Sequence, residues 1–224
     1  MNSSYKTIVF DFDSTIVAVE SLEFLAETAL EGTTTKVEIL EKMRSITDRG
    51  MSGELSIAKS LSERFELIRA HRKHIAPTAE KLVAYISKSF LNRPDFFSNS
   101  KFDVHVVSSG FFDLIYPSTD TLGIPRAHVH ANTFAYDAES NILGPTDDSV
   151  LARPMGKVQV IRTLGLMLPL AMVGDGFTDF EVKKYGAAQS FIYYAEHVKR
   201  EGVSKEGDVL AYNLDDILSY LDAH

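Results

Sequence analysis

The chain has 224 residues, 45% of them apolar, which is typical of a globular protein. Its formal net charge of -8 argues against nucleic acid as a partner. It contains no cysteine, which excludes disulfides, thiolate zinc sites and a cysteine nucleophile. No apolar run approaches the roughly 20 residues of a membrane span, and the first residues lack a signal-peptide pattern, so we expect no membrane partner and a cytoplasmic location.

The first predicted element is an apolar β-type run, Thr7 to Phe10, followed at once by Asp11 and Asp13. Because an extended chain alternates its side chains, both carboxylates should project to one side while Phe12 packs to the other. In a parallel sheet they would lie at the carboxyl end of the strand, where open α/β folds bind ligands. Such a pair of like charges favours a divalent cation, and oxygen ligands suit Mg²⁺. The alternative is a strand that ends in an Asx-type turn.

Residues 20 to 90 are predicted to form four helices. Ser21 and Thr35 are favourable N-caps for the first two, and the fourth is expected to start after Pro77. The spacing of apolar residues in the second and third helices places the following side chains on the inward face: Val37, Leu40 and Met43, then Leu55, Ala58, Leu61, Phe65 and Ile68. No convincing strand intervenes. We therefore expect a small helical-bundle cap over residues 16-90, inserted into a core formed by 1-15 and 91-224.

The second half of the chain alternates β-type and helical patterns. Strands are predicted at 102–107, 168–173, 190–194 and 208–212, helices at 111–116, 155–164 and from Leu214, and a β-hairpin from the pieces 129–136 and 142–143. Strands that alternate with helices imply right-handed crossovers and a mostly parallel sheet. The predicted fold class is therefore α/β, with a doubly wound, Rossmann-like core, a helical cap and a hairpin excursion.

Polar groups of complementary types follow three of the predicted strands, and a parallel sheet would bring them to one edge. They are Asp11 and Asp13, then Ser109 and Gly110, then Asp175 and Asp179, with Lys157 at the start of the helix that precedes the last pair. Carboxylates can hold Mg²⁺, while a hydroxyl, a glycine N–H and a lysine can hold phosphate oxygens. The pattern predicts phosphoryl transfer. With no cysteine and no obvious catalytic histidine, an aspartate is the expected nucleophile, forming an aspartyl-phosphate.

The same segments resemble the four ordered motifs of haloacid dehalogenase superfamily phosphatases, and their order and spacing span nearly the whole chain. The matching segments are Asp11-Phe12-Asp13-Ser14-Thr15, Ser109-Gly110, Lys157 and Gly174-Asp175-Gly176-Phe177-Thr178-Asp179. Within that superfamily the chain is most similar to the phosphoserine phosphatase family. That family's first motif is followed by a glutamate, here Glu20, and its cap carries a pattern like residues 51–56 followed by 60–64.

The resemblance implies a role for each matched residue. Asp11 would attack phosphorus, and Asp13 would protonate the leaving seryl oxygen and then activate water. The implied metal set is Asp11, Asp13 (through its backbone carbonyl), Asp175 and Asp179, the last of these ordering the water shell of Mg²⁺. The implied substrate-binding set is Ser109, Gly110 and Lys157 at the phosphoryl group, Glu20 at the ammonium, Arg64 at the carboxylate, and Met51, Ile57 and Thr178. The expected reaction is hydrolysis of L-phosphoserine by a monomer or homodimer.

Three positions depart from the family pattern. Ile57 stands where the family usually has Phe, and Phe111 replaces a second Gly after the phosphate-binding Ser; both are expected to alter the shape of the pocket. Thr178 stands where many members have Asn and can still form a hydrogen bond. These departures leave open a related phosphatase or phosphotransferase for another small phosphorylated amine or alcohol. A non-catalytic phosphate-binding module is the third alternative.

Several candidate residues also have purely structural interpretations. Glu20 could be a favourable charge at the start of a helix, and Arg64 could snorkel from an apolar stripe. Among the histidines, His71 and His74 are expected in a solvated segment. His128 and His130 would share one face of a β-type run without a third clear ligand, so we do not predict a zinc site there.

Overall fold

The computed structural model describes residues 4–224, and its central feature is a six-stranded sheet with the order β3-β2-β1-β6-β7-β8. All neighbouring strands in this sheet are parallel. The strands are β1 (Thr7–Phe10), β2 (Asp103–Phe111), β3 (Val129–Asn132), β6 (Leu170–Gly174), β7 (Ser190–Tyr194) and β8 (Val209–Ala211). The chain builds one side of the sheet outward from β1, then returns to β6 and builds the other. The carboxyl ends of β1 and β6 therefore lie at the topological switch point, where such sheets bind ligands.

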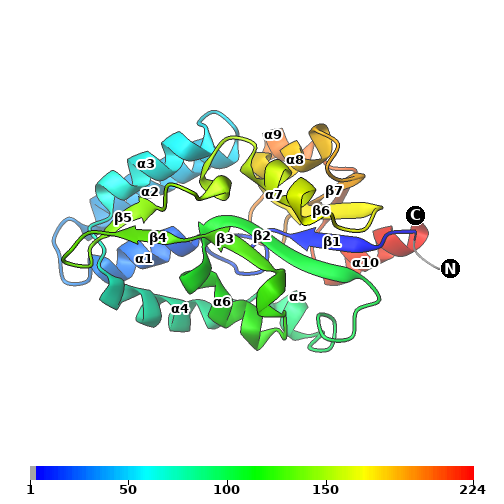
Figure 1. Cartoon of the computed structure of the whole chain (residues 1–224), viewed down its shortest axis with the longest axis horizontal. Helices are drawn as coiled ribbons and strands as arrows, with labels where there is room; N and C mark the ends of the chain where they lie inside the picture. Colours follow the sequence, from blue (N-terminus) through cyan, green and yellow to red (C-terminus); the bar gives the residue numbers. More distant parts are fainter. Residues whose placement is uncertain (1–3) are drawn as a thin grey trace.

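Helices cover both faces of the sheet, which explains why strands such as β6 are buried along their whole length. Figure 1 shows α7 (Gly156–Leu164), α8 (Phe177–Lys184) and α9 (Glu201–Ser204) on one face, and α5 (Lys88–Leu91), α6 (Phe112–Thr121) and α10 (Leu214–Ala223) on the other. Each face has its own apolar core. The prediction of a doubly wound, mostly parallel α/β fold is confirmed.

Of the helices that lie between β1 and β2 in the chain, the first four gather at one end of the molecule (Figure 1). They are α1 (Ser21–Ala29), α2 (Lys36–Met51), α3 (Ile57–Leu67) and α4 (Ile75–Val83). Together with the antiparallel hairpin of β4 (Phe134–Tyr136) and β5 (Ile142–Pro145), they enclose a third apolar core. Short 3-10 turns cover Arg72–His74, Arg126–His128 and Val150–Ala152. No helix among residues 4–224 combines the length and the apolar character needed to cross a membrane.

Two predicted helix faces differ from the observed ones. Val37 was expected to point inward but is 69% exposed, so the buried stripe of α2 begins one turn later, at Leu40. In α3 the side chain of Ala58 is exposed, whereas Ser60 and Arg64 are buried. The apolar spacing did not predict that Ser60 and Arg64 belong to the inward face of α3, because this face contacts a polar cavity as well as the apolar core.

Some predicted boundaries also shift. The fourth helix begins at Ile75, with Pro77 inside its first turn. A backbone N–H in the first turn has no partner within the helix, so proline, which lacks one, is tolerated there. Strand β2 continues to Phe111 instead of ending at Val107. The run 129–136, predicted as one arm of a hairpin, is divided at Thr133: its first part joins the main sheet beside β2, and only its second part forms the hairpin.

The hairpin is attached to the cap helices by aromatic packing. Phe134 stacks on Phe111 with ring centroids 3.9 Å apart and an interplanar angle of 4°, and Phe65 of α3 packs edge-on against both rings. Phe134 is 3% exposed. This cluster connects the end of β2, the hairpin and α3.

We expect Phe134→Ala to lower the free energy of unfolding by about 3 to 5 kcal/mol, because it opens a cavity in this cluster. Denaturant unfolding measures the effect. Leu143→Ala in the same hairpin is the control: Leu143 is 61% exposed, and its loss should change stability by no more than about 0.5 kcal/mol. Equal effects of the two substitutions would contradict the packing described.

Candidate active site

A polar cavity lies between the carboxyl ends of the central strands and the helices α2 and α3. Every residue predicted for catalysis or substrate binding lines it: Asp11, Asp13, Glu20, Met51, Ile57, Arg64, Ser109, Gly110, Lys157 and Thr178. Asp175 and Asp179, predicted for the metal, are fully buried beside Asp11. Residues from distant parts of the chain therefore meet at the switch point of the sheet.

Asp11 forms an ion pair with Lys157 at the base of the cavity. Asp11 directly follows β1, and Lys157 lies in the first turn of α7; Nζ is 2.8 Å from Asp11 Oδ1 and 2.6 Å from Asp179 Oδ1. Burial alone would lower the pKa of Lys157, but the two carboxylates outweigh burial and raise it above its ordinary value. Lys157 is therefore a permanent cation in a site with little water. As expected from alternation, Phe12 packs away from the cavity into the sheet core.

Three carboxylates crowd next to this lysine. One oxygen from each of Asp11, Asp175 and Asp179 lies within 4.8 Å of the others. Gly174 makes the close approach possible, because a Cβ at that position would collide with the carboxylate of Asp179. Burial raises the pKa of Asp179 to about 7 against the opposing effect of Lys157. Burial also raises the pKa of Asp175, although Arg200 opposes the rise.

This carboxylate group fits a hard divalent cation. Its donor atoms are all oxygens, and Asp175 Oδ1 is buried without a hydrogen-bond partner among residues 4–224. A buried, unpaired carboxylate oxygen is costly unless a cation or a proton neutralises it. An ion with oxygen ligands, such as Mg²⁺ or Ca²⁺, would supply that neutralisation.

Asp13 is held by the start of α1. The backbone N–H and the hydroxyl of Ser21 donate to its two carboxyl oxygens, both at 2.9 Å. Ser21 was predicted as an N-cap but is the first residue of the helix, and its side chain bonds Asp13 instead. Enclosure of Asp13 raises its pKa well above the ordinary value, and the nearby charges of Glu20 and Asp11 add to the rise. Asp13 is therefore suited to hold a proton at neutral pH.

The cap side of the cavity presents one anion and one cation. Glu20 Oε1 accepts a hydrogen bond of 2.7 Å from Ser14. Arg64 is 7% exposed, and its Nε donates to the Ser60 carbonyl at 3.3 Å. Burial lowers the pKa of Arg64, opposed by Glu20 and other carboxylates, but no carboxylate within residues 4–224 forms an ion pair with it. The carboxylates near Arg64 therefore act on it only from beyond ion-pair distance, and the guanidinium has no direct anionic partner.

Arg200 is a site residue that the sequence did not indicate. Its Nε lies 3.1 Å from Asp175 Oδ2, and its terminal nitrogens lie 3.6 Å from Glu20 and 3.1 Å from Asp48 of α2. It thus connects the carboxylate group with the cap. In the sequence it stands beside Lys199 in an unpatterned polar segment, so only the three-dimensional packing identifies it.

Ser108 is a second residue that was missed. It is 1% exposed, lines the cavity, and accepts a hydrogen bond of 3.0 Å from the Gly110 N–H. Strict alternation would turn Ser108 and Ser109 to opposite sides of β2, yet both line the cavity. The register of β2 against β3 shifts between Val107 and Phe111, so alternation alone could not have identified Ser108.

Phe111, expected to change the shape of the pocket, does not line it. It is fully buried and stacks on Phe134 in the cap and hairpin core. That expectation was therefore wrong, because Phe111 lies at the last position of β2 and faces away from the cavity. Ile57, the other departure, does line the cavity.

The loop after α2 closes the cavity against α8. Gly53 has φ +83°, and a Cβ there would lie 2.7 Å from the ring of Phe177. Nearby, the methyl group of Met51 is so close to Gly176 that a Cβ on that glycine would lie 2.9 Å away. The volume open to the centre of a water molecule is only about 30 Å³ in the cavity. The side chains around the cavity therefore leave little free space in it.

Comparison with known proteins gives a consistent set of relatives, although no family model matches. The chain is 30% identical over 222 residues to the chloroplastic phosphoserine phosphatase of Arabidopsis thaliana, covering 98% of this chain and 72% of that protein. It is 26% identical over 207 residues to the phosphoserine phosphatase of Methanocaldococcus jannaschii, covering 85% and 87%.

Solved structures agree with these relatives. A phosphoserine phosphohydrolase-like protein from Francisella tularensis matches with a TM-score of 0.87 and 26% identity, over 96% of this chain and 99% of that one. A substrate-bound phosphoserine phosphatase matches with a TM-score of 0.78 and 22% identity, over 98% and 99%. At that identity the second match concerns the fold alone.

We expect Gly53→Ala to loosen the contact between this loop and α8, because the new methyl group would overlap Phe177. Amide hydrogen exchange over residues 51–55 should become faster. Gly32→Ala is the matched control: Gly32 has φ +79° but no atom within 4 Å of the new Cβ, so it bears only the backbone strain of about 1 to 2 kcal/mol. If loop exchange is the same in both variants, the contact with Phe177 does not hold the loop.

Proposed function

This chain belongs to the phosphoserine phosphatase family of the haloacid dehalogenase superfamily, and we propose from that premise that it hydrolyses L-phosphoserine to L-serine and phosphate with Mg²⁺. The family consists of phosphoric monoester hydrolases that act on small phosphorylated substrates and use a divalent metal ion. The observation that carries the choice of substrate is Arg64, a buried guanidinium without a direct ion pair to any carboxylate of residues 4–224, in the same cavity as Asp11. The carboxylate of an amino-acid substrate would supply the missing anion.

Asp11 is the proposed nucleophile. Lys157 pairs with Oδ1, which leaves Oδ2 to attack phosphorus. The new bond joins Oδ2 to phosphorus, the bond from phosphorus to the seryl oxygen breaks, and an aspartyl-phosphate forms. A water oxygen then attacks phosphorus, the bond to Asp11 breaks, and phosphate is released.

Asp13 is the proposed acid and base for these two steps. Its raised pKa supports a protonated carboxyl that gives its proton to the leaving seryl oxygen. The carboxylate that remains can take a proton from the attacking water. The two hydrogen bonds from Ser21 keep the carboxyl oriented toward the cavity in both steps.

The metal and the phosphoryl group would share the end of the sheet. Asp11, Asp175 and the backbone carbonyl of Asp13 would hold Mg²⁺, and Asp179 would order its water ligands. The ion would supply positive charge to the phosphoryl oxygens. The proposed phosphoryl ligands are Lys157, Ser108, Ser109 and the Gly110 N–H; on binding, that N–H would exchange its bond to Ser108 for one to a phosphoryl oxygen.

The cap side would recognise the amino acid. We assign Arg64 to the substrate carboxylate and Glu20 to its ammonium group, with Met51 and Ile57 as apolar walls and Thr178 as a hydrogen-bonding group. A planar guanidinium can bind a carboxylate through two parallel hydrogen bonds. A related phosphatase for another small phosphorylated amine or alcohol would use the same Asp11 but would leave Arg64 unpaired.

We further propose that residues 16–90 act as a mobile cap on a core of 1–15 and 91–224. The small free volume of the closed cavity supports this, because phosphoserine can enter only if the cap moves. The chain enters the proposed cap near Val17 and leaves it near Ile86. These two residues form an isolated antiparallel β-bridge, and both side chains pack into the sheet core. That pair is the proposed hinge. A cytoplasmic location and a monomeric or homodimeric state remain predictions.

Asp11→Asn should abolish phosphate release from phosphoserine, because an amide oxygen is a poor nucleophile, while the protein remains folded. Phosphate release with added Mg²⁺ measures the effect, and circular dichroism checks the fold. Wild type in excess chelator should also be inactive and should recover with Mg²⁺. Near-normal turnover by Asp11→Asn would rule out the covalent route through this residue.

Arg64→Ala tests the choice of substrate. It would leave the substrate carboxylate buried and unpaired, a loss of about 2 to 5 kcal/mol, so kcat/KM for phosphoserine should fall roughly 30-fold to several thousand-fold. Phosphoethanolamine lacks the carboxylate, and its slower hydrolysis should hardly change. Arg69→Ala, at an exposed arginine outside the cavity, is the control. Equal losses on both substrates would mean that Arg64 supports the cap, and no wild-type preference for phosphoserine would favour the related phosphatase.

A further inference from the structure

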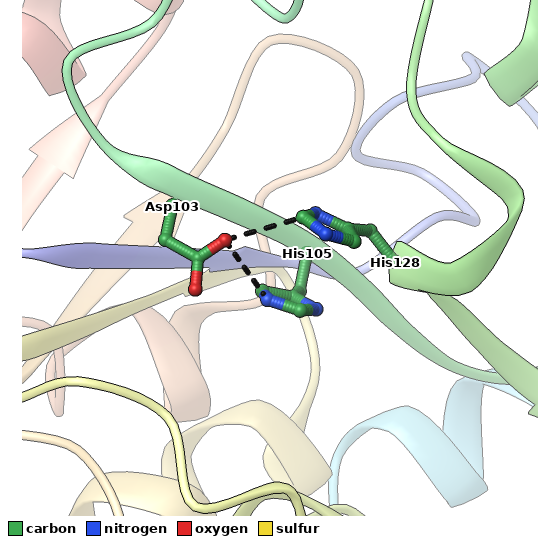
Figure 2. A group of neighbouring side chains, drawn as sticks. All are labelled: Asp103, His105 and His128. Atoms are coloured by element: carbon green, nitrogen blue, oxygen red, sulfur yellow. Dashed lines mark ion pairs between the residues drawn. The ribbon is translucent and has the colours of Figure 1, made fainter.

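A cluster of two histidines and an aspartate lies at the opposite end of β2 from the active site. Figure 2 shows Asp103 and His105 on β2 and His128 on the segment that leads into β3, with the carboxylate facing both rings. Asp103 Oδ1 is 3.1 Å from His105 Nε2 and 3.7 Å from His128 Nδ1. Ser109 lies six positions after Asp103 along β2, about 20 Å at strand rise. The cluster is therefore distinct from the catalytic cavity.

We propose that Asp103, His105 and His128 form a second metal site, specific for a transition metal ion such as Zn²⁺. One donor atom from each residue lies within 4.8 Å of the others. In a tetrahedral site with bonds of 2.0 to 2.1 Å the donor atoms lie about 3.3 Å apart, so the two distances from Asp103 already bracket the required spacing. Two imidazoles and one carboxylate leave a fourth position for water, as in open zinc sites.

The two imidazoles are already arranged side by side. The rings of His105 and His128 stack with centroids 4.2 Å apart and an interplanar angle of 9°, and both turn an edge toward Asp103 (Figure 2). The His128 Nδ1 also lies 2.9 Å from the Val104 carbonyl. Metal binding must replace that hydrogen bond and displace its proton. The His128 ring is partly exposed and would rotate to make this exchange.

His130 supplies the outer contact that metal-binding histidines require. Its Nε2 lies 3.3 Å from His105 Nδ1, the ring nitrogen that faces away from Asp103. Such a partner fixes the tautomer and the ring orientation of a ligand histidine.

The donor set separates this site from the catalytic one. Nitrogen ligands favour Zn²⁺, Ni²⁺ or Cu²⁺, whereas Mg²⁺ prefers oxygen ligands such as those of Asp11 and Asp175. Asp103 and His128 are 27% and 34% exposed, so an ion can reach the cluster from solvent. A bound ion would connect β2 with the segment before β3 and stabilise that edge of the sheet. The sequence did not show the cluster, because spacing alone paired His128 with His130 and left out the two ligands on β2.

The test is Zn²⁺ binding to the full chain by calorimetry, with Mg²⁺ in excess to occupy the oxygen site. Wild type should bind one Zn²⁺ ion tightly, and Zn²⁺ should raise its Tm. His128→Gln and Asp103→Asn should each weaken binding by more than about 100-fold, because they remove a direct ligand, and His130→Gln by about 10- to 100-fold, as expected for an outer contact. His224→Gln, at an exposed histidine outside the cluster, should bind as wild type does.

Phosphatase activity with Mg²⁺ should be unchanged in His128→Gln, which shows that the variant is folded and that the two sites are separate. The proposal fails if excess Mg²⁺ abolishes all Zn²⁺ binding to the wild type. It also fails if His128→Gln and His224→Gln bind Zn²⁺ equally well, since binding would then be to surface histidines in general. A Zn²⁺-induced rise in Tm that survives in both His128→Gln and Asp103→Asn would overturn it as well.

Discussion

Negative charge at the carboxyl ends of β1 and β6 is the constraint on which the active site depends. Asp11, Asp175 and Asp179 bring carboxylate oxygens within 4.8 Å of one another in a buried place, and within residues 4–224 only Lys157 and Arg200 form ion pairs with them. Burial makes such a group unstable unless a further cation or protons neutralise it. The same charge imbalance accounts for the fit to a divalent ion, while burial, with the charges of Glu20 and Asp11, raises the pKa of the neighbouring Asp13.

In the proposed function, chemistry and recognition are divided between the two parts of the molecule. Asp11, Asp175, Asp179 and Lys157 lie at the carboxyl end of the sheet, on the segments that follow β1 and β6 and on α7 and α8, and their proposed roles do not depend on what the phosphoryl group is attached to. Arg64 of α3 is buried without a direct ion-pair partner among residues 4–224, and in the proposal it distinguishes one leaving group from another. Arg200 contacts both Asp175 and Asp48 of α2, so it links the carboxylate group to the proposed cap.

The sequence predicted the features that follow from local periodicity. Alternation after β1 placed Asp11 and Asp13 toward the cavity and Phe12 in the core, and the strand and helix patterns gave the doubly wound sheet. Contacts between distant segments were beyond it. Arg200 stands in an unpatterned segment, and His128 meets His105 only because β3 lies beside β2. Phe111 was misjudged because the length of β2 depends on its neighbours in the sheet, not on its own residues.

The central claim is that Asp11 becomes covalently phosphorylated during turnover. Acid quenching of wild-type protein while it hydrolyses phosphoserine with Mg²⁺, followed by mass spectrometric sequencing of its peptides, tests this most directly. The account predicts a phosphoryl group on Asp11 that is absent when the substrate or the metal ion is withheld. A phosphoryl group on Asp13, Asp175 or Asp179 instead, or rapid turnover with no phosphorylated peptide, would contradict it.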